Sequence, residues 1–198
     1  MTTKEEKFFK NNRWFHGTTL YEWKLLCQSG IIANYNMGAS LDFGCGFYLS
    51  PSEKDTQKYA MDTVKYNGSC DGDDNIPVVI EFEYSPYNDI ISGIKYKYFG
   101  KYDNEFADFV FECRKNRMYH YNKNEITAGV MTDTIPTKLM QEFFAGIKNK
   151  EAVTSEFMKS TSKKQLCLHT QKLCDKLIIV KAYTVNGKEL DVNEYKKR

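Results

Sequence analysis

Three short segments of the sequence carry residue types that could do chemistry. They are Phe15-His16-Gly17-Thr18, the glycine-rich Phe43-Gly44-Cys45-Gly46-Phe47-Tyr48-Leu49-Ser50, and Lys164-Gln165-Leu166-Cys167-Leu168-His169. Histidine and tyrosine side chains can hydrogen-bond to a ligand, and an amide can orient a hydroxyl group without supplying charge. Each segment alone also fits an ordinary structural role, because a lone histidine after a strand is usually satisfied by its neighbours. It is their combination and order that suggest a site.

The elements around the first two segments are predicted to be strands that feed helices. Residues 13–17 suit a strand, and residues 19–27 carry apolar side chains at helical spacing with Gly30 as a stop signal. The glycine turn at 43–50 enters a second strand. A helix follows from Pro51-Ser52-Glu53 to about Thr63, because serine caps a helix and proline suits its first turn.

Later elements are assigned by the same periodicities. Strands are predicted at 76–84, within 119–129, at 164–169 and at 176–184, and helices at 105–113, 137–147 and 151–159. The polar stretch 67–75 is predicted to be a surface loop. It lacks the glutamate that an EF-hand loop requires, so no metal site is expected there.

The three segments together resemble the ADP-ribosyltransferase superfamily, in its diphtheria-toxin and poly(ADP-ribose) polymerase branch. In that branch a strand ends in His-Gly-Ser/Thr, and a later Phe-Gly-x-Gly-Ile-Tyr-Phe-Ala loop precedes a helix with a tyrosine; here His16-Gly17-Thr18, Phe43–Ser50 and Tyr59 take those places. The chain more narrowly resembles a bacterial family of small proteins within that superfamily. The resemblance spans about residues 13–183 and is specific at the motifs.

The resemblance implies an α+β fold, a split and mostly antiparallel β-sandwich with surrounding helices and a cleft for NAD. It implies that His16 binds the adenosine-side ribose of NAD with Thr18 assisting, and that the backbone of Gly17 pairs with the nicotinamide carboxamide. It also implies that Tyr48 stacks on the nicotinamide and that Tyr59 forms the other side of this clamp. Ser50, which ends the motif, is counted among the NAD-binding residues.

The third catalytic position departs from the better-known enzymes, which place a glutamate on a late strand. The aligned residue here is Gln165, and a neutral amide cannot act as a general base. Glu125, in an earlier predicted strand, is the competing candidate for the acidic role; Gln165 is preferred because it lies in the late strand. His120 and His169 do not occupy motif positions and are expected to have structural roles.

Composition sets the broad class. The chain has 198 residues with a formal net charge of +2, which suits a single domain and excludes a strongly basic nucleic-acid-binding surface. A local basic rim for nucleic-acid binding, formed by Lys148, Lys150, Lys163 and Lys164, is left as an alternative. The sequence shows no long apolar run and no secretory signal, so a cytoplasmic protein without membrane contact is expected, although export by a signal-less route is possible. Its six cysteines are expected to be reduced thiols.

The function expected from the resemblance is mono-ADP-ribosyl transfer. NAD would be a substrate, no metal would be needed, and the macromolecular acceptor, protein or nucleic acid, stays open. Because Gln165 replaces the glutamate, polymer formation is not expected. Two alternatives are a catalytically inactive module that binds NAD or ADP-ribose, and a non-enzymatic interaction protein. The biological role, as a toxin, a defence component or a housekeeping enzyme, is also open.

Overall fold

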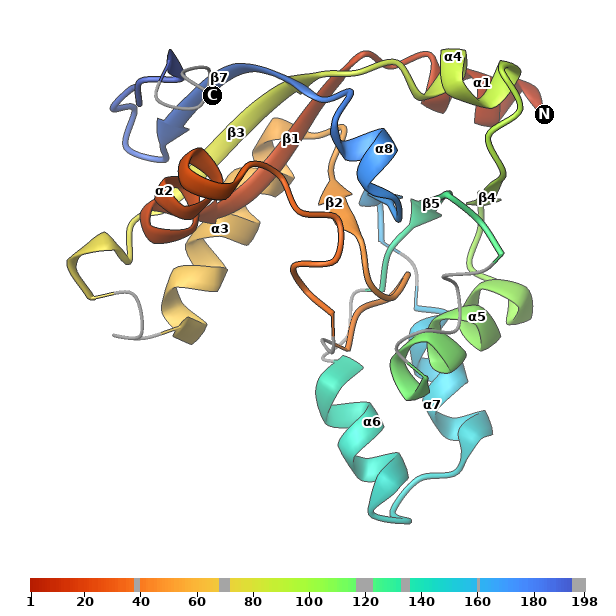
Figure 1. The fold of residues 1–198 in the computed structure, drawn as a ribbon. Helices are drawn as coiled ribbons and strands as arrows, with labels where there is room; N and C mark the ends of the chain where they lie inside the picture. Colours follow the sequence, from red (N-terminus) through yellow and green to blue (C-terminus); the bar gives the residue numbers. More distant parts are fainter. Residues whose placement is uncertain (38–39, 68–71, 117–122, 133–135, 160, 194–198) are drawn as a thin grey trace.

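A computed structural model describes residues 1–37, 40–67, 72–116, 123–132, 136–159 and 161–193. These residues form two β-sheets with helices around them, so the expected α+β class is confirmed (Figure 1). The first sheet has the order β1 (Arg13–Thr19), β3 (Pro77–Glu83), β7 (Ile178–Thr184). The second has the order β2 (Phe47–Leu49), β6 (Lys164–Leu168), β5 (Ile126–Val130), β4 (Tyr96–Phe99). All neighbouring strands are antiparallel except β4 and β5.

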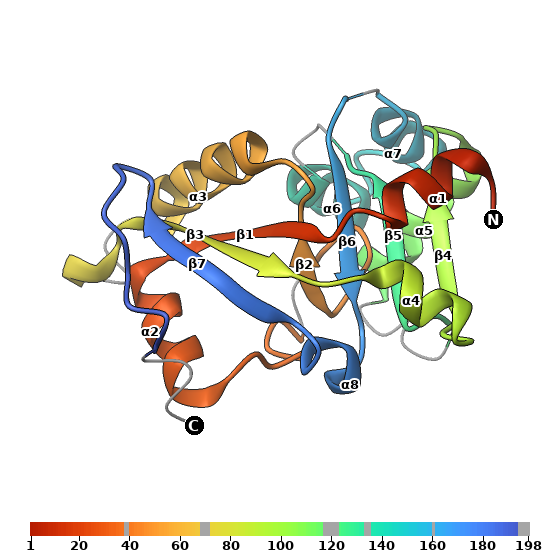
Figure 2. The same cartoon turned by 90° about the horizontal axis from the view of Figure 1, so that it is seen from above.

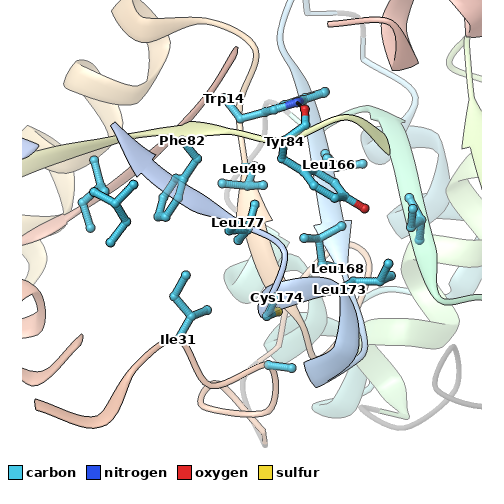
Figure 3. Close-up of a cluster of buried hydrophobic side chains, with 14 of the residues drawn as sticks. Trp14, Ile31, Leu49, Phe82, Tyr84, Leu166, Leu168, Leu173, Cys174 and Leu177 are labelled. Carbon is cyan, nitrogen blue, oxygen red and sulfur yellow. Dashed lines mark hydrogen bonds between the residues drawn. The ribbon is translucent and has the colours of Figure 1, made fainter. Parts of the chain in front are cut away.

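The two sheets share one hydrophobic core. Successive side chains of a strand point to opposite faces, and from each sheet one set of alternate residues enters this core. Trp14 and Phe82 come from the first sheet, and Leu49, Leu166 and Leu168 from the second (Figure 3). All five are buried. Burial of these apolar surfaces holds the sheets against each other.

Two helices cover opposite faces of the first sheet (Figure 2). Helix α2 (Leu20–Ser29) adds Trp23 and Cys27 to the core shared by the sheets. Helix α3 (Glu53–Asn67) lies on the other face, and Ser52 caps it by accepting a hydrogen bond from the backbone N–H of Asp55 at 3.3 Å. The sequence predicted both helices, including the stop of α2 at Gly30.

A second cluster of buried side chains covers the outer face of the second sheet. It contains Phe43, Phe99 and Cys167 together with residues of α5 (Asn104–Lys115), α6 (Pro136–Phe144) and α7 (Lys150–Phe157). Figure 1 shows these three helices gathered below β5 and β4. The remaining helices are α1 (Thr3–Phe9), α4 (Pro86–Ile91), α8 (Gln171–Cys174) and the 3-10 turn η1 (Gly72–Asp74).

The sequence patterns missed α1, α4, α8 and β4. Strand β4 has only one buried residue, Phe99, so it does not show the alternation that marks a half-buried strand. Helix α1 is short, and the rings of Phe8 and Phe9 pack at an angle against Tyr98, which belongs to a distant segment. The predicted strand within 119–129 is in fact Ile126–Val130, and residues 117–122 of that stretch lie outside the described residues.

Several boundaries also differ from the prediction. Helix α3 continues to Asn67, beyond the predicted end near Thr63, and α6 ends at Phe144 instead of Ile147. The predicted loop 67–75 begins at the last residue of α3 and contains η1, while residues 68–71 are outside the described part.

The five described cysteines are buried thiols, and Cys70 lies outside the described residues. Among the helices of the described chain, none combines the length and the apolar character needed to cross a bilayer.

Candidate functional site

A cavity of about 550 Å³ brings together most of the site residues that the sequence predicted. Strands β1, β2 and β6 and helices α2 and α3 contribute residues to its wall. Seven predicted residues line it: His16, Gly17, Thr18, Tyr48, Ser50, Tyr59 and Gln165. Pockets for small-molecule ligands commonly have volumes of about 300–1,000 Å³, so this cavity is of suitable size.

The sheets are joined at this cavity by a backbone bridge. Phe15 and Ser50 exchange two hydrogen bonds, with N–O distances of 2.9 and 2.8 Å. This bridge places His16, the next residue on β1, beside β2. The Nδ1 atom of His16 lies 2.8 Å from the carbonyl oxygen of Tyr48, and its ring stacks on Phe47 at a centroid distance of 4.5 Å.

These contacts determine the chemical state of His16. A carbonyl oxygen can only accept, so Nδ1 carries the proton and donates, and the other ring nitrogen, Nε2, is an acceptor while the ring is neutral. Burial lowers the pKa of His16 below its ordinary value, and the hydrogen bond to Tyr48 opposes this shift. The neutral ring can therefore accept a hydrogen bond from a ligand hydroxyl.

Tyr48 presents its ring to the cavity but not a free hydroxyl. The hydroxyl donates to the carbonyl oxygen of Gly44 at 2.7 Å and accepts from the backbone N–H of Phe43 at 3.0 Å. Burial raises the pKa of Tyr48 well above its ordinary value, so the phenol stays protonated. The group it can offer a ligand is its ring face.

Gly17 is required for packing of the helix against the strand. A Cβ atom at this position would lie 2.8 Å from the carbonyl oxygen of Thr56 and 3.2 Å from the ring of Tyr59, both on α3. The absence of a side chain lets α3 approach β1 closely and brings Tyr59 to the cavity wall. Tyr59 is 57% exposed, so its ring is accessible from solvent.

Thr18 and Ser50 are the two hydroxyl residues of the predicted site. Thr18 lines the cavity and is buried. Ser50 also lines it, but its Oγ accepts from the backbone N–H of Ser52 at 3.1 Å and donates to the carbonyl oxygen of the same residue at 3.3 Å. Ser50 therefore closes the turn that leads into α3.

Gln165 reaches the cavity from β6. Tyr48 pairs with Cys167 across β2 and β6, so Gln165, two residues away, projects from the same face of the sheet. Diagonal neighbours of this kind are about 7–8 Å apart. The Nε2 atom of Gln165 is buried and has no hydrogen-bond partner among the described residues.

Glu125 is placed elsewhere. It directly precedes β5 and is not among the residues that line the cavity. Its Oε2 accepts from the backbone N–H of Lys95 at 3.4 Å, and its carbonyl oxygen accepts from the N–H of His169. Gln165 pairs with Gly129, at the opposite end of β5. The structure thus brings Gln165, and not Glu125, to His16 and Tyr48.

Sequence reasoning missed a buried polar cluster in the cavity wall. Asp42, Arg114 and Thr132 all line the cavity. Arg114 donates to Oδ1 of Asp42 from Nε at 2.9 Å and from Nη2 at 2.5 Å, and Thr132 donates its backbone N–H to Oδ2 at 3.0 Å. A signal was available: Arg114 follows Ala107 and Val110 at helical spacing and so lies on the apolar face of α5.

His169 has the structural role expected for it. It is 1% exposed, its Nδ1 lies 2.7 Å from the carbonyl oxygen of Cys45, and its Nε2 lies 2.9 Å from the hydroxyl of Thr127. His120 lies outside the described residues.

The cavity wall carries charges of both signs. The acidic lining residues are Glu22, Asp42, Asp55 and Asp62, and the basic ones are Lys58, Arg114, Lys163 and Lys164. Only Lys163 and Lys164 of the predicted basic rim line the cavity; Lys148 and Lys150 form ion pairs with Glu142 and Asp108. Within the described ranges, no group of His, Cys, Asp and Glu is arranged to hold a metal ion.

Comparison of the sequence with models of known protein families identifies one family. Residues 32–179 match the family described as "Protein of unknown function (DUF3990)". The chain belongs to this family. No curated protein and no solved structure matches it. In this DUF3990 protein the matched region contains Tyr48, Gln165 and the Asp42–Arg114 pair, whereas His16 and β1 precede it. Part of the cavity wall is therefore built outside the region that defines the DUF3990 family.

Proposed function

We propose that the protein is a mono-ADP-ribosyltransferase that cleaves the bond between nicotinamide and ribose in NAD and transfers ADP-ribose to a macromolecular acceptor. One observation supports this above all: His16, Tyr48 and Gln165, which are far apart in the sequence, line the same cavity. These are the positions that match the catalytic residues of the ADP-ribosyltransferase superfamily. The two-sheet core, with its mostly antiparallel pairing, is compatible with the split sandwich of that superfamily.

The side chains suit the proposed roles. Neutral His16 accepts a hydrogen bond from a ribose hydroxyl through Nε2, and the Tyr48 ring stacks on the nicotinamide. Tyr59 closes the clamp from α3. The buried amide of Gln165, which has no described partner, donates to an oxygen of the nicotinamide-side ribose and fixes its orientation.

The proposed reaction is dissociative. The bond from ribose C1′ to the nicotinamide nitrogen breaks, and its electron pair leaves with nicotinamide. A nucleophilic atom of the acceptor then forms a bond to C1′ and loses its proton to solvent. Gln165 is neutral and cannot take that proton, so the rate depends on orientation of NAD and on the nucleophilicity of the acceptor.

The test is release of nicotinamide from NAD by the purified protein, with ADP-ribose-labelled NAD and fractionated lysate as the source of acceptor. We expect label in one fraction, and loss of both signals in His16→Ala and Tyr48→Ala. Tyr66→Ala is the matched control, since Tyr66 also lies in this part of the molecule but is 87% exposed and does not line the cavity. Wild-type turnover in a folded His16→Ala, Tyr48→Ala double variant would reject the proposed site.

The second candidate function is binding of NAD or ADP-ribose without catalysis. It is favoured by the neutral Gln165 and by Asp42, a buried cavity carboxylate whose two oxygens already accept hydrogen bonds from Arg114 and Thr132. Binding without catalysis predicts that NAD raises the thermal stability, by about 2.7 kcal/mol at 100 times its dissociation constant, while no nicotinamide is released.

A further inference from the structure

The loop 42–46, which leads into β2, is anchored to other parts of the molecule at Asp42, Cys45 and Gly46. The Asp42 carboxylate is held by Arg114 of α5 and by Thr132, which follows β5. Arg114 also donates from Nη1 to the carbonyl oxygen of Ser40 at 2.6 Å. Both side chains of the ion pair are nearly inaccessible, with 7% of Arg114 and 6% of Asp42 exposed. The loop is thereby tied to the helical layer of the molecule.

The rest of the loop is tied to other elements. The carbonyl oxygen of Cys45 lies 2.7 Å from Nδ1 of His169. The side chain of Asn36 accepts from the N–H of Gly46 at 3.0 Å and donates to its carbonyl oxygen at 2.7 Å. These contacts leave the backbone of the loop little freedom to move.

Tyr48 depends on this loop for its orientation. Its hydroxyl is held by the N–H of Phe43 and the carbonyl oxygen of Gly44, which directly follow Asp42. A displacement of Asp42 would shift both groups, and with them the far end of the Tyr48 ring. The ring lies in the cavity wall, so its plane defines the surface on which a flat ligand would stack.

We propose that the Asp42–Arg114 ion pair positions the ring of Tyr48, acting through the backbone of Phe43 and Gly44. Neither Asp42 nor Arg114 is required to touch NAD in this role. The inference rests on the proposed function for what the ring binds, but the mechanical link between the pair and the ring stands on the contacts above. Hydrogen bonds to a charged group are the stronger ones, which suits a pair that must hold a loop.

A double-mutant cycle tests the link. Asp42→Asn removes the charge from the anchor, and Tyr48→Phe keeps the ring but removes the hydroxyl that the loop holds. We expect Asp42→Asn to lower kcat/KM for nicotinamide release about tenfold in the wild type, and less than about twofold in Tyr48→Phe, because the loop can no longer act on the ring. Equal losses in both backgrounds would overturn the proposal.

A matched control separates positioning from stability. Asp89 is another buried aspartate, paired with Lys176 and hydrogen-bonded by Tyr84 at 2.8 Å, and it does not line the cavity. Asp89→Asn should lower Tm while leaving kcat/KM within about twofold of wild type. If Asp42→Asn does not fold, Thr132→Val takes its place in the cycle, because it removes one hydrogen-bond donor to the same carboxylate. The same pattern of losses is then expected.

Amide hydrogen exchange gives a readout that does not need NAD. The N–H of Phe43 donates to the Tyr48 hydroxyl, so its exchange rate should rise in Asp42→Asn or Thr132→Val. The rate should not change in Asp89→Asn. If the wild type releases no nicotinamide, the proposed function fails, while this exchange still tests the link. Unchanged exchange at Phe43 in the Asp42→Asn and Thr132→Val proteins would overturn the link itself.

Discussion

At the scale of single residues, the proposed reaction depends most on Gln165. It stands where a carboxylate would be expected, and its amide nitrogen is buried without a described partner. A buried polar group in this state costs stability, which a bound ligand would recover by accepting its hydrogen bond. In the proposed reaction Gln165 would therefore orient the ligand and would not remove a proton.

Gln165→Glu tests this role. A carboxylate can stabilise the developing cation at ribose C1′ and accept the proton of water or an acceptor, so we expect nicotinamide release to rise, by up to about 10²-fold. Tm should fall, because a partly buried carboxylate is desolvated. Release and Tm are measured together, with Glu125→Gln as the control that should leave release unchanged. Unchanged nicotinamide release in both Gln165→Glu and Gln165→Ala would contradict the assignment of Gln165 to the third catalytic position.

His16 predicts a pH dependence. Its pKa is lowered in the folded protein by burial, so the unfolded chain binds more protons between the ordinary pKa of about 6.5 and the folded value. The stability that His16 contributes is complete above about pH 6.5 and is lost as the pH falls from there toward the folded pKa. Tm measured from pH 7.5 to 5 should therefore fall less steeply in His16→Asn than in wild type; parallel curves would contradict this.

At the scale of elements, the position of Tyr48 follows from how closely β2 approaches β6. Gly46 comes just before β2, and a Cβ atom there would lie 2.4 Å from Sγ of Cys167 and 2.8 Å from the carbonyl oxygen of Leu168. Only glycine lets the chain enter β2 in the register that pairs Tyr48 with Cys167. The second glycine of the motif is thus explained by strand packing.

Gly46→Ala should therefore be costly. The added methyl group would force β2 away from β6, and we expect a loss of about 1–3 kcal/mol in the free energy of unfolding together with weaker NAD turnover. Gly100→Ala is the control, since the atom nearest to the added Cβ would be a ring atom of Tyr98 at 3.1 Å, a much milder contact than at Gly46. Equal denaturation midpoints for the two variants would show that β2 and β6 have more room than the structure indicates.

The element scale also shows how far the sequence patterns extend. The strand and helix at 13–30 were predicted closely, because apolar residues at helical spacing and a glycine stop are local signals. Strand β4 was not predicted, because its pairing partner β5 lies far along the chain and its own residues are mostly half-buried. Pairing between distant segments leaves no mark in the local pattern of an edge strand.

At the scale of the whole molecule, both sheets contribute to one core. Trp14 of β1 and Leu166 of β6 belong to the same cluster of buried residues, so the sheets should not unfold separately. The two tryptophans of the chain, Trp14 and Trp23, both lie in this core and report on it.

Leu166→Ala tests this cooperativity. The change removes a fully buried side chain and should cost about 2–5 kcal/mol. Although Leu166 lies in the second sheet, the tryptophan fluorescence transition should shift as far as the far-UV circular dichroism transition, and the two should coincide. A fluorescence transition that stays in place while the dichroism shifts would mean that the sheets are independent units.

The sequence alone indicated which segments carry the candidate chemistry, because motif residues are recognised by their local order and spacing. It selected His16, Tyr48 and Gln165 and predicted the strands and helices that hold them. It left Gln165 and Glu125 as competitors, and it did not reveal the Asp42–Arg114 pair. Tertiary structure placed Gln165, but not Glu125, in the cavity wall, since strand register sets the two residues at opposite ends of β5. It also formed the Asp42–Arg114 pair, because the partners of a buried charge come from segments that only folding brings into contact.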